Sequence, residues 1–151
     1  MVLIGKQKHL LDFVKKCHGE QKRKYTGEPY WTHVYNVAEK VSKHESGAIE
    51  IALCHDLFED TLCTPDILFG KLLLIGYSSE RAEEIVSGVT DLTDVYTKES
   101  YPYLNRKKRK ALENMRLSKI PPLSQSIKYA DLIDNTKSIT KHDKDFAKVY
   151  L

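Results

Sequence analysis

The chain has 151 residues, of which 41% are hydrophobic and 30% charged, a balance typical of a soluble globular protein with a real core. No apolar stretch approaches the roughly 20 residues of a membrane-spanning helix, and the N-terminus lacks the apolar core of a signal peptide. The three cysteines show no zinc-ligand spacing and are expected to be reduced thiols. We therefore expect one domain over residues 1–151, in the cytoplasm and without a membrane partner.

In chain order, apolar residues at helical spacing predict one helix after another. The first helix is expected to end at Gly19, and Pro29 can open the second because proline tolerates the first helical turn. Thr64, Pro65 and Asp66 form a helix start with a cap and an acid at the positive end. The predicted helices cover about residues 3–18, 29–44, 46–61, a segment from 64 limited by Gly70 and Gly76, 79–89, 104–117 and 123–140. Residues 90–94 are expected to form a loop, and no stretch has the apolar–polar alternation of a strand, so we predict an all-α domain.

The net charge of +3 is small, and its placement along the chain is uneven. Basic residues concentrate at 21–24 and 106–110, and acidic residues around 56–66 and 80–94. That separation suits an anionic substrate held between a metal ion and a basic rim. The run at 106–110 contains no aromatic residue, so a solvated helix face is favoured over a nucleic-acid patch. No nucleic-acid partner is therefore expected.

The segment 46–61 carries the most informative pattern. Residues 49–54 are apolar on nearly every side, which is typical of a buried helix. If the helix continues, His55, Asp56, Glu59 and Asp60 share one face, because residues three and four apart stack. Buried carboxylates need partners, and a divalent cation would serve one histidine and several acids at once. A plain solvated acidic face explains the same pattern.

Two further ionisable residues, His33 and Asp131, lie in mostly apolar helical stretches and could complete a metal site. Two imidazoles with two carboxylates suit Mn, Fe, Co or Zn better than Ca or Mg. Glu59 and Asp60 then lie one turn from the ligands, where they could act on water bound to the metal. An ordinary core histidine and an ordinary surface acid remain the alternative interpretation of each residue alone.

The motifs also stand in a recognisable order. They occupy residues 18–33, 37–38, 53–61, 64, 69–70, 88–92, 128–131 and 135, within about residues 9–140. This ordered set resembles the HD-domain phosphohydrolases and, more narrowly, the hydrolase domain of the RelA/SpoT family and its small single-domain alarmone hydrolases. The resemblance implies an all-helical HD-fold bundle with a single bound ion, usually Mn²⁺ and otherwise another divalent transition metal.

The resemblance also implies a role for particular residues. The implied metal ligands are His33, His55, Asp56 and Asp131. The implied catalytic pair, which activates or orients water, is Glu59 and Asp60. Arg23 matches an arginine that stacks on guanine, and a planar guanidinium suits a planar base. Lys24 and Asn135 match nucleotide contacts, and Lys107 in the basic run is a further candidate for a phosphate contact.

The expected reaction is removal of the 3′-pyrophosphate from guanosine tetra- or pentaphosphate, giving GDP or GTP and pyrophosphate. Two other functions remain open at this point. One is an HD phosphatase for another nucleotide, such as a 5′-nucleotidase or an NADPH phosphatase, and the other is a non-catalytic module that senses a nucleotide. The partner expected in each case is a small-molecule nucleotide. A homo-oligomer is also open, because Tyr96, Tyr101 and Tyr103 could close over a base, anchor the core or form a dimer contact.

Overall fold

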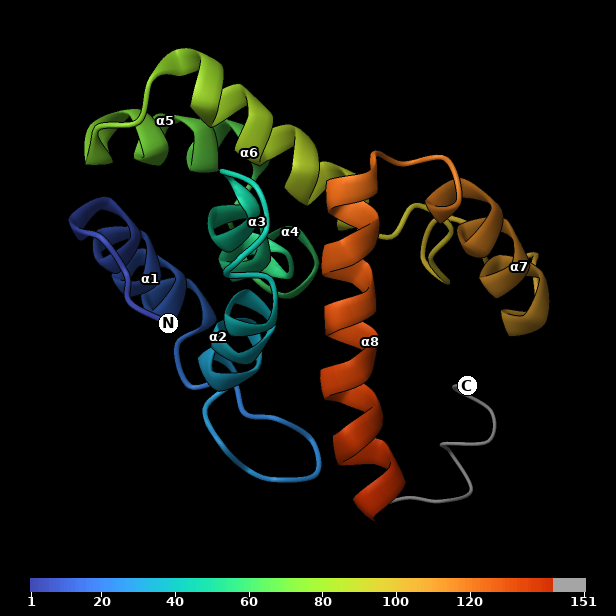
Figure 1. Cartoon of the computed structure of the whole chain (residues 1–151). Helices are drawn as coiled ribbons and strands as arrows, with labels where there is room; N and C mark the ends of the chain where they lie inside the picture. The colour runs from blue at the N-terminus through green and yellow to red at the C-terminus, as the bar shows by residue number, and fades with distance from the viewer. Residues whose placement is uncertain (143–151) are drawn as a thin grey trace.

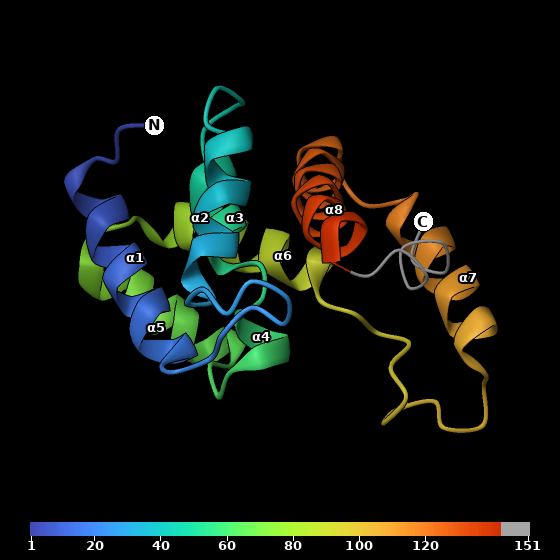
Figure 2. The same ribbon diagram turned by 90° about the horizontal axis from the view of Figure 1, so that it is seen from below.

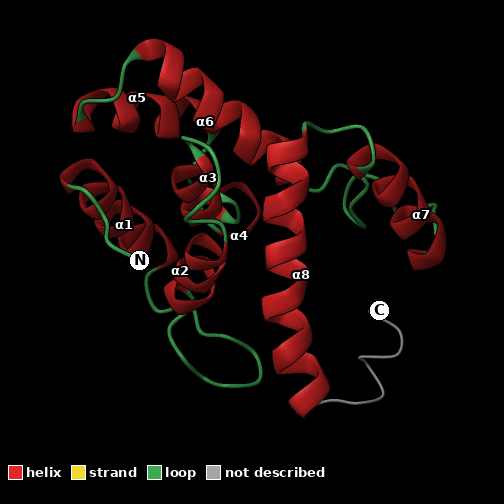
Figure 3. Cartoon of the chain, viewed as in Figure 1, coloured by secondary structure: helices red, strands yellow, loops and turns green. Residues whose placement is uncertain are grey.

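The computed structural model describes residues 1–142, which form helices joined by loops (Figures 1 and 3). The helices are α1 Gly5–His18, α2 Trp31–Lys40, α3 Ala48–Cys54, α4 Leu57–Asp60, α5 Pro65–Ile75, α6 Ser79–Leu92, α7 Arg106–Leu117 and α8 Pro122–His142. Over these residues no strand forms, and one isolated bridge joins Lys22 to Pro29. The predicted all-helical class is therefore confirmed. No helix in the described part is long and apolar enough to cross a membrane.

Helix α3 lies at the centre of the bundle, where it packs against α1, α2, α6 and α8. All of its residues except Ile49 are buried, as the apolar pattern of this segment predicted. Helix α8 runs between the bundle of α1–α6 and α7, so that α7 stands to one side (Figures 1 and 2). The arrangement leaves one face of α8 toward α3 and the opposite side toward α7.

Two helix ends show how local sequence determines the bundle. The Thr64 hydroxyl accepts a hydrogen bond from the Ile67 N–H, and Pro65 follows in the first turn of α5, as predicted. Helix α5 ends at Gly76, whose φ of 120° is a left-handed conformation that favours glycine. Gly70, which was expected to limit this helix, lies inside it.

A different glycine lets two helices approach closely. A Cβ atom at Gly88 in α6 would lie 2.5 Å from Ile51 Cδ1 in α3. No real Cβ contact is that short, so the α3–α6 packing depends on the absence of a side chain at this position.

The segment predicted as one helix over 46–61 is broken, and this is the main correction to the sequence-based fold. Helix α3 ends at Cys54, and α4 begins only at Leu57. The carbonyl of Ala52, which the Asp56 N–H would bind in a continuous helix, lies 2.6 Å from the His55 Nδ1 atom. Asp56 has φ −103° and ψ 1°, outside the helical values. The break turns the His55 and Asp56 side chains toward α8.

Other boundaries also differ from those expected. Helix α6 continues through residues 90–92, which were predicted to be a loop. Leu92 is buried, and the Arg116 guanidinium donates to the carbonyls of Asp91 and Thr93, so contacts with α7 hold this end of the helix. Helix α2 ends at Lys40, several residues before the predicted end. All three cysteines lie within the described residues and are free thiols, as expected.

Candidate metal centre

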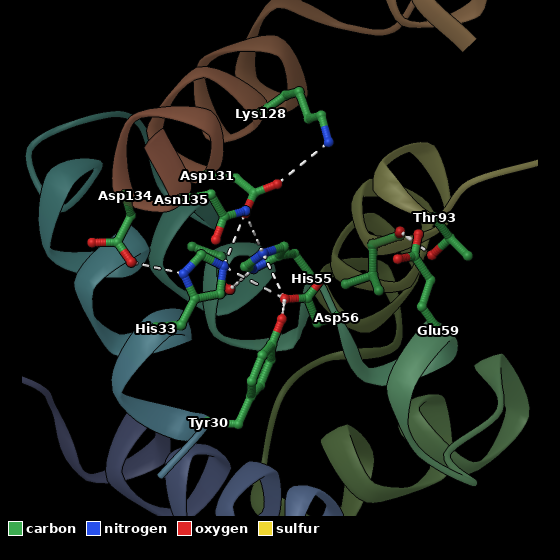
Figure 4. Close-up of polar contacts among 12 residues, drawn as sticks. Tyr30, His33, His55, Asp56, Glu59, Thr93, Lys128, Asp131, Asp134 and Asn135 are labelled. Carbon is green, nitrogen blue, oxygen red and sulfur yellow. Dashed lines mark hydrogen bonds and ion pairs between the residues drawn. The ribbon is translucent and has the colours of Figure 1, made fainter. Parts of the chain in front are cut away.

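Four side chains from separate segments meet beside α8 (Figure 4). His33 comes from α2, His55 and Asp56 from the break between α3 and α4, and Asp131 from α8. Each offers one ligand atom, and these atoms all lie within 4.8 Å of one another. His33 and His55 are only 1% and 2% exposed, and Asp131 is 7% exposed. The four residues predicted as ligands are therefore brought together in the interior.

The Nε2 atoms of both histidines face the carboxylates. His33 Nε2 lies 2.9 Å from Asp131 Oδ1 and 3.6 Å from Asp56 Oδ2. His55 Nε2 lies 3.3 Å from Asp131 Oδ1 and 3.1 Å from Asp56 Oδ2. Two imidazole nitrogens and two carboxylate oxygens thus point at one small volume, which is a donor set that divalent transition metals accept.

The other nitrogen of each ring has its own acceptor. His33 Nδ1 lies 2.8 Å from Asp134 Oδ2, and His55 Nδ1 lies 2.6 Å from the Ala52 carbonyl oxygen. A carbonyl oxygen only accepts, so His55 Nδ1 carries a proton and a neutral ring presents its Nε2 lone pair to the cluster. This arrangement of ring nitrogens is typical of metal-binding histidines. The residues present therefore fit a metal ion, and the cluster could hold a divalent one.

The carboxylates of the cluster are also oriented by hydrogen bonds. The Tyr30 hydroxyl donates to Asp56 Oδ2 at 2.7 Å. Asn135 Nδ2 donates to Asp131 Oδ1 at 3.1 Å, and Lys128 Nζ lies 3.3 Å from Asp131 Oδ2. The carboxylates of Asp56 and Asp131 are thus each held in place by hydrogen bonds from neighbouring side chains.

The electrostatics of the cluster favour added positive charge. Burial alone would lower the pKa of His55, but Asp56 and Asp131 raise it well above the usual value. Burial would raise the pKa of Asp131, but His55 and His33 hold it well below its usual value. Without a metal ion, protons on the histidines supply the positive charge that the carboxylates require, and a divalent cation can replace them.

Glu59 and Asp60, the predicted catalytic pair, lie on α4 one turn after Asp56. Glu59 Oε1 accepts a hydrogen bond from the Asp94 N–H at 2.6 Å. Figure 4 shows its side chain beside Thr93, apart from the four candidate ligands. Partial burial of the carboxyl group and the nearby Asp94 charge raise the pKa of Glu59 to about 8. Burial and Asp56 also raise the pKa of Asp60, so both groups can exchange protons closer to neutral pH than ordinary acids do.

The predicted substrate contacts are divided between two places. Arg23 lies at the edge of the cluster, where NH1 is 2.9 Å from Asp134 Oδ2 and NH2 donates to Asn135 Oδ1 at 3.5 Å. Lys24 is exposed, and its ammonium lies 5.3 Å from the centre of the Tyr25 ring. Lys107 is exposed on α7, which lies on the other side of α8 from the cluster (Figure 1). The structure brings Arg23 and Asn135 to the cluster and leaves Lys107 away from it.

Sequence reasoning missed the supporting roles of Tyr30, Lys128 and Asp134. Each lies three residues from a predicted ligand in a helix or at its start. Residues at this spacing share a helix face, so the spacing could have pointed to them once the ligands were assumed. Their partners across the fold could not be read from the spacing.

Comparison with known proteins gives two curated relatives. The chain is 35% identical over 132 residues to the guanosine-3′,5′-bis(diphosphate) 3′-pyrophosphohydrolase of Aquifex aeolicus. It is 34% identical over 139 residues to the probable guanosine-3′,5′-bis(diphosphate) 3′-pyrophosphohydrolase of Mycoplasma pneumoniae. Each match covers 85% of this chain and 17% of the relative, so the chain spans about a sixth of the length of these proteins. No protein-family model matches the chain.

A solved structure is also similar over nearly the whole chain. It is that of a metazoan ortholog of SpoT described as hydrolysing ppGpp. The TM-score is 0.75 at 25% identity, and the match covers 95% of this chain and 75% of the other. The fold and the buried His–Asp cluster therefore define an all-helical domain of the HD type. Within that class the chain matches the RelA/SpoT-type hydrolase domain, as its motifs predicted.

Proposed function

We propose that the chain is a metal-dependent phosphohydrolase that converts (p)ppGpp to GDP or GTP and pyrophosphate. The main support is the cluster of His33, His55, Asp56 and Asp131, whose ligand atoms lie within 4.8 Å of one another with both Nδ1 atoms already engaged. The two curated relatives, which are 35% and 34% identical to the chain over the matched residues, carry the name of this reaction. The reaction forms a bond from a water oxygen to the phosphorus nearest the ribose, and the bond from that phosphorus to the 3′ oxygen breaks.

We assign Mn²⁺ as the ion, because two imidazoles and two carboxylates suit a transition metal that accepts further ligands. When bound, the ion lowers the pKa of a coordinated water and neutralises charge on the phosphoryl group. Tyr30, Asn135 and Lys128 hold the two carboxylates of the site in a fixed orientation. The protein thus supplies a set of ligands that needs little rearrangement on binding.

Glu59 is proposed to accept a proton during the reaction, and Asp60 is proposed to orient the attacking water. A group with a pKa of about 8, such as Glu59, can release and accept a proton near neutral pH. It can therefore accept a proton from the attacking water, while the 3′ oxygen takes up a proton from solvent as it leaves. Asp60, adjacent on α4, is proposed to orient the same water.

Arg23 is proposed to stack on the guanine base. Its N–H edge is held by Asp134 and Asn135, which fixes the plane of the guanidinium. A fixed plane reduces the entropy lost when a base stacks on it. Lys24 is proposed as a further nucleotide contact, and Lys107, on the far side of α8, is proposed as a phosphate contact. The substrate is then a small-molecule nucleotide in the cytoplasm, with no nucleic acid or membrane needed.

Two other functions use the same fold and ligands. A phosphatase for another nucleotide would keep the metal cluster and differ only in the groups around the base. A non-catalytic sensor would have no use for two acids one helical turn after Asp56, so the presence of Glu59 and Asp60 favours an enzyme.

A turnover assay of purified, manganese-loaded protein tests these functions against one another. The substrates are ppGpp, pppGpp, NADPH and a panel of nucleoside monophosphates, and the control is His55→Ala. We expect pyrophosphate release from the two alarmones and none in the control. Turnover of another nucleotide alone would retain the phosphohydrolase and reject the alarmone. Metal binding without turnover of any substrate would favour the sensor.

A further inference from the structure

A pocket of about 760 Å³ lies between α7 and α8, outside the metal cluster. The segment after α6 contributes Asp94 and Tyr96 to its wall. A volume of this size falls in the range of small-molecule sites. The function proposed above uses none of the residues that α7 contributes to this pocket.

The wall of the pocket carries mostly positive charge. Helix α7 contributes Arg106, Arg109 and Lys110, and α8 contributes Lys128. The acids on the wall are Asp94 and Glu113. The Glu113 carboxylate is paired with Arg116, which does not line the pocket. The wall therefore carries more positive than negative charge.

Glu113 is buried and holds the segment after α6 against α7. Its Oε1 accepts hydrogen bonds from the Val95 and Tyr96 N–H groups, both at 2.6 Å. Its Oε2 lies 2.8 Å from Arg116 NH2. This carboxylate therefore fixes the shape of the pocket, and its charge is compensated within the fold.

Two residues of the pocket wall contact residues of the candidate site. Lys128 lines the pocket, and its Nζ lies 3.3 Å from Oδ2 of the candidate ligand Asp131 (Figure 4). Asp94 lines the pocket as well, and its N–H binds Glu59 Oε1. Lys128 therefore connects the basic wall to the candidate ligand Asp131, and Asp94 connects it to Glu59.

We propose that this pocket binds the diphosphate group of the nucleotide that is not cleaved, and this inference rests on the function proposed above. A nucleotide with a diphosphate on each side of its ribose presents one to the metal and must place the other elsewhere. Arginine side chains bind phosphate oxygens in a planar fork, and lysines add point charge. The free pyrophosphate product has the same chemistry, so the test must separate the two.

The test compares two double variants. Arg106→Ala/Lys110→Ala removes two charges from the pocket wall. Lys108→Ala/Lys119→Ala removes one charge from α7 and one from the turn after it, at exposed positions that do not line the pocket. Alanine keeps the helix in both, and circular dichroism confirms the fold of each metal-loaded protein.

Calorimetry measures the affinity of each variant for GDP directly. Because each charge-assisted hydrogen bond contributes substantially to affinity, we expect the pocket variant to bind GDP about tenfold more weakly or worse. The control variant should stay within about twofold of the wild type, since distant exposed charges are screened. Equal affinity in the two variants would overturn the proposal. Weaker binding of inorganic pyrophosphate with GDP binding unchanged would assign the pocket to the free diphosphate and overturn the nucleotide assignment.

Kinetics with ppGpp provides a second readout. The remote diphosphate binds alike in the ground and transition states, so the pocket variant should raise KM about tenfold and leave kcat within about threefold. A single charge reversal, Lys110→Glu, should raise KM more than Lys108→Glu does, and equal effects would reject the pocket. If the protein hydrolyses no alarmone while the GDP affinity still depends on the pocket residues, the proposed reaction fails and the pocket assignment stands.

Discussion

The Nδ1 atom of His33 lies 2.8 Å from Oδ2 of Asp134. The Nε2 atom of the same ring lies 2.9 Å from Asp131 Oδ1, one helical turn earlier on α8. Two acids on one face of α8 therefore hold both nitrogens of a single buried imidazole. This pairing fixes the plane of the ring and directs Nε2 toward the cluster.

Asp134→Asn should weaken metal binding. The substitution keeps the shape of the side chain and removes the charge that orients His33. Loss of such a partner reduces metal affinity by about 10–100-fold. Competition with a chelator for bound Mn²⁺ measures the change. Lys40→Ala is the control, because it removes an ion pair of Asp134 but no contact of the ring; an unchanged affinity in Asp134→Asn would contradict the role.

Tyr30→Phe should lower metal affinity without unfolding the protein. Burial and Asp56 raise the pKa of the Tyr30 hydroxyl, so it remains a donor to Asp56 Oδ2 across the working pH range. Removing the hydroxyl leaves the carboxylate less well oriented, with an expected loss of about tenfold in metal affinity. Tyr35→Phe, on the far side of α2 in contact with Trp31, is the comparison, and equal affinities in the two variants would reject the effect.

Metal binding should strengthen as the pH rises through neutrality. Burial alone would lower the pKa of His55, but the combined charges and hydrogen bonds of Asp56 and Asp131 raise it well above the usual value. The metal-free cluster therefore holds protons that the ion must displace, and lower pH favours the protonated form. Calorimetry in buffers of different ionisation enthalpy should detect proton release on binding. Absence of proton release at pH 7 would show that the histidines are already neutral.

Glu59 should control the pH dependence of the reaction. Its pKa, raised to about 8 by partial burial and by Asp94, means that the basic form increases as the pH rises. If it accepts the proton of water, kcat/KM should rise between about pH 6 and 8, with a bound cation moving the rise to lower pH. Glu59→Gln should remove this rise along with most of the activity. A pH profile with the same rise in Glu59→Gln would assign it to another group.

Two glycine substitutions should change stability in opposite directions. Gly88→Ala places a Cβ 2.5 Å from Ile51 Cδ1 and should destabilise the fold by about 1–3 kcal/mol. Gly70→Ala meets nothing within 4 Å on the exposed face of α5 and should stabilise it by about 0.5–1 kcal/mol. Urea unfolding of both variants measures the difference. A neutral Gly88→Ala would mean that Ile51 can move without cost.

The helical fold was largely predictable because its signals are local. The cap at Thr64, the glycine at Gly76 and the apolar run of α3 each act within a few residues, and each appears in the structure as expected. The break at His55 was not predicted, because it depends on a side chain taking a backbone acceptor that the helix would otherwise use. The continuation of α6 through Leu92 was missed for a similar reason, since Arg116 from a distant helix holds that end.

The sequence by itself determined which residue types could bind a metal and in what order they occur. His33, His55, Asp56 and Asp131 could be named from their places in apolar helices and from the family resemblance. Only the tertiary structure decided that their ligand atoms converge within 4.8 Å, that Asp134 engages His33, and that α7 and α8 enclose a basic pocket beside them. The physical reason is distance along the chain: spacing reports neighbours within a helix, whereas contacts between α2, α3 and α8 arise only when buried apolar surfaces pack together.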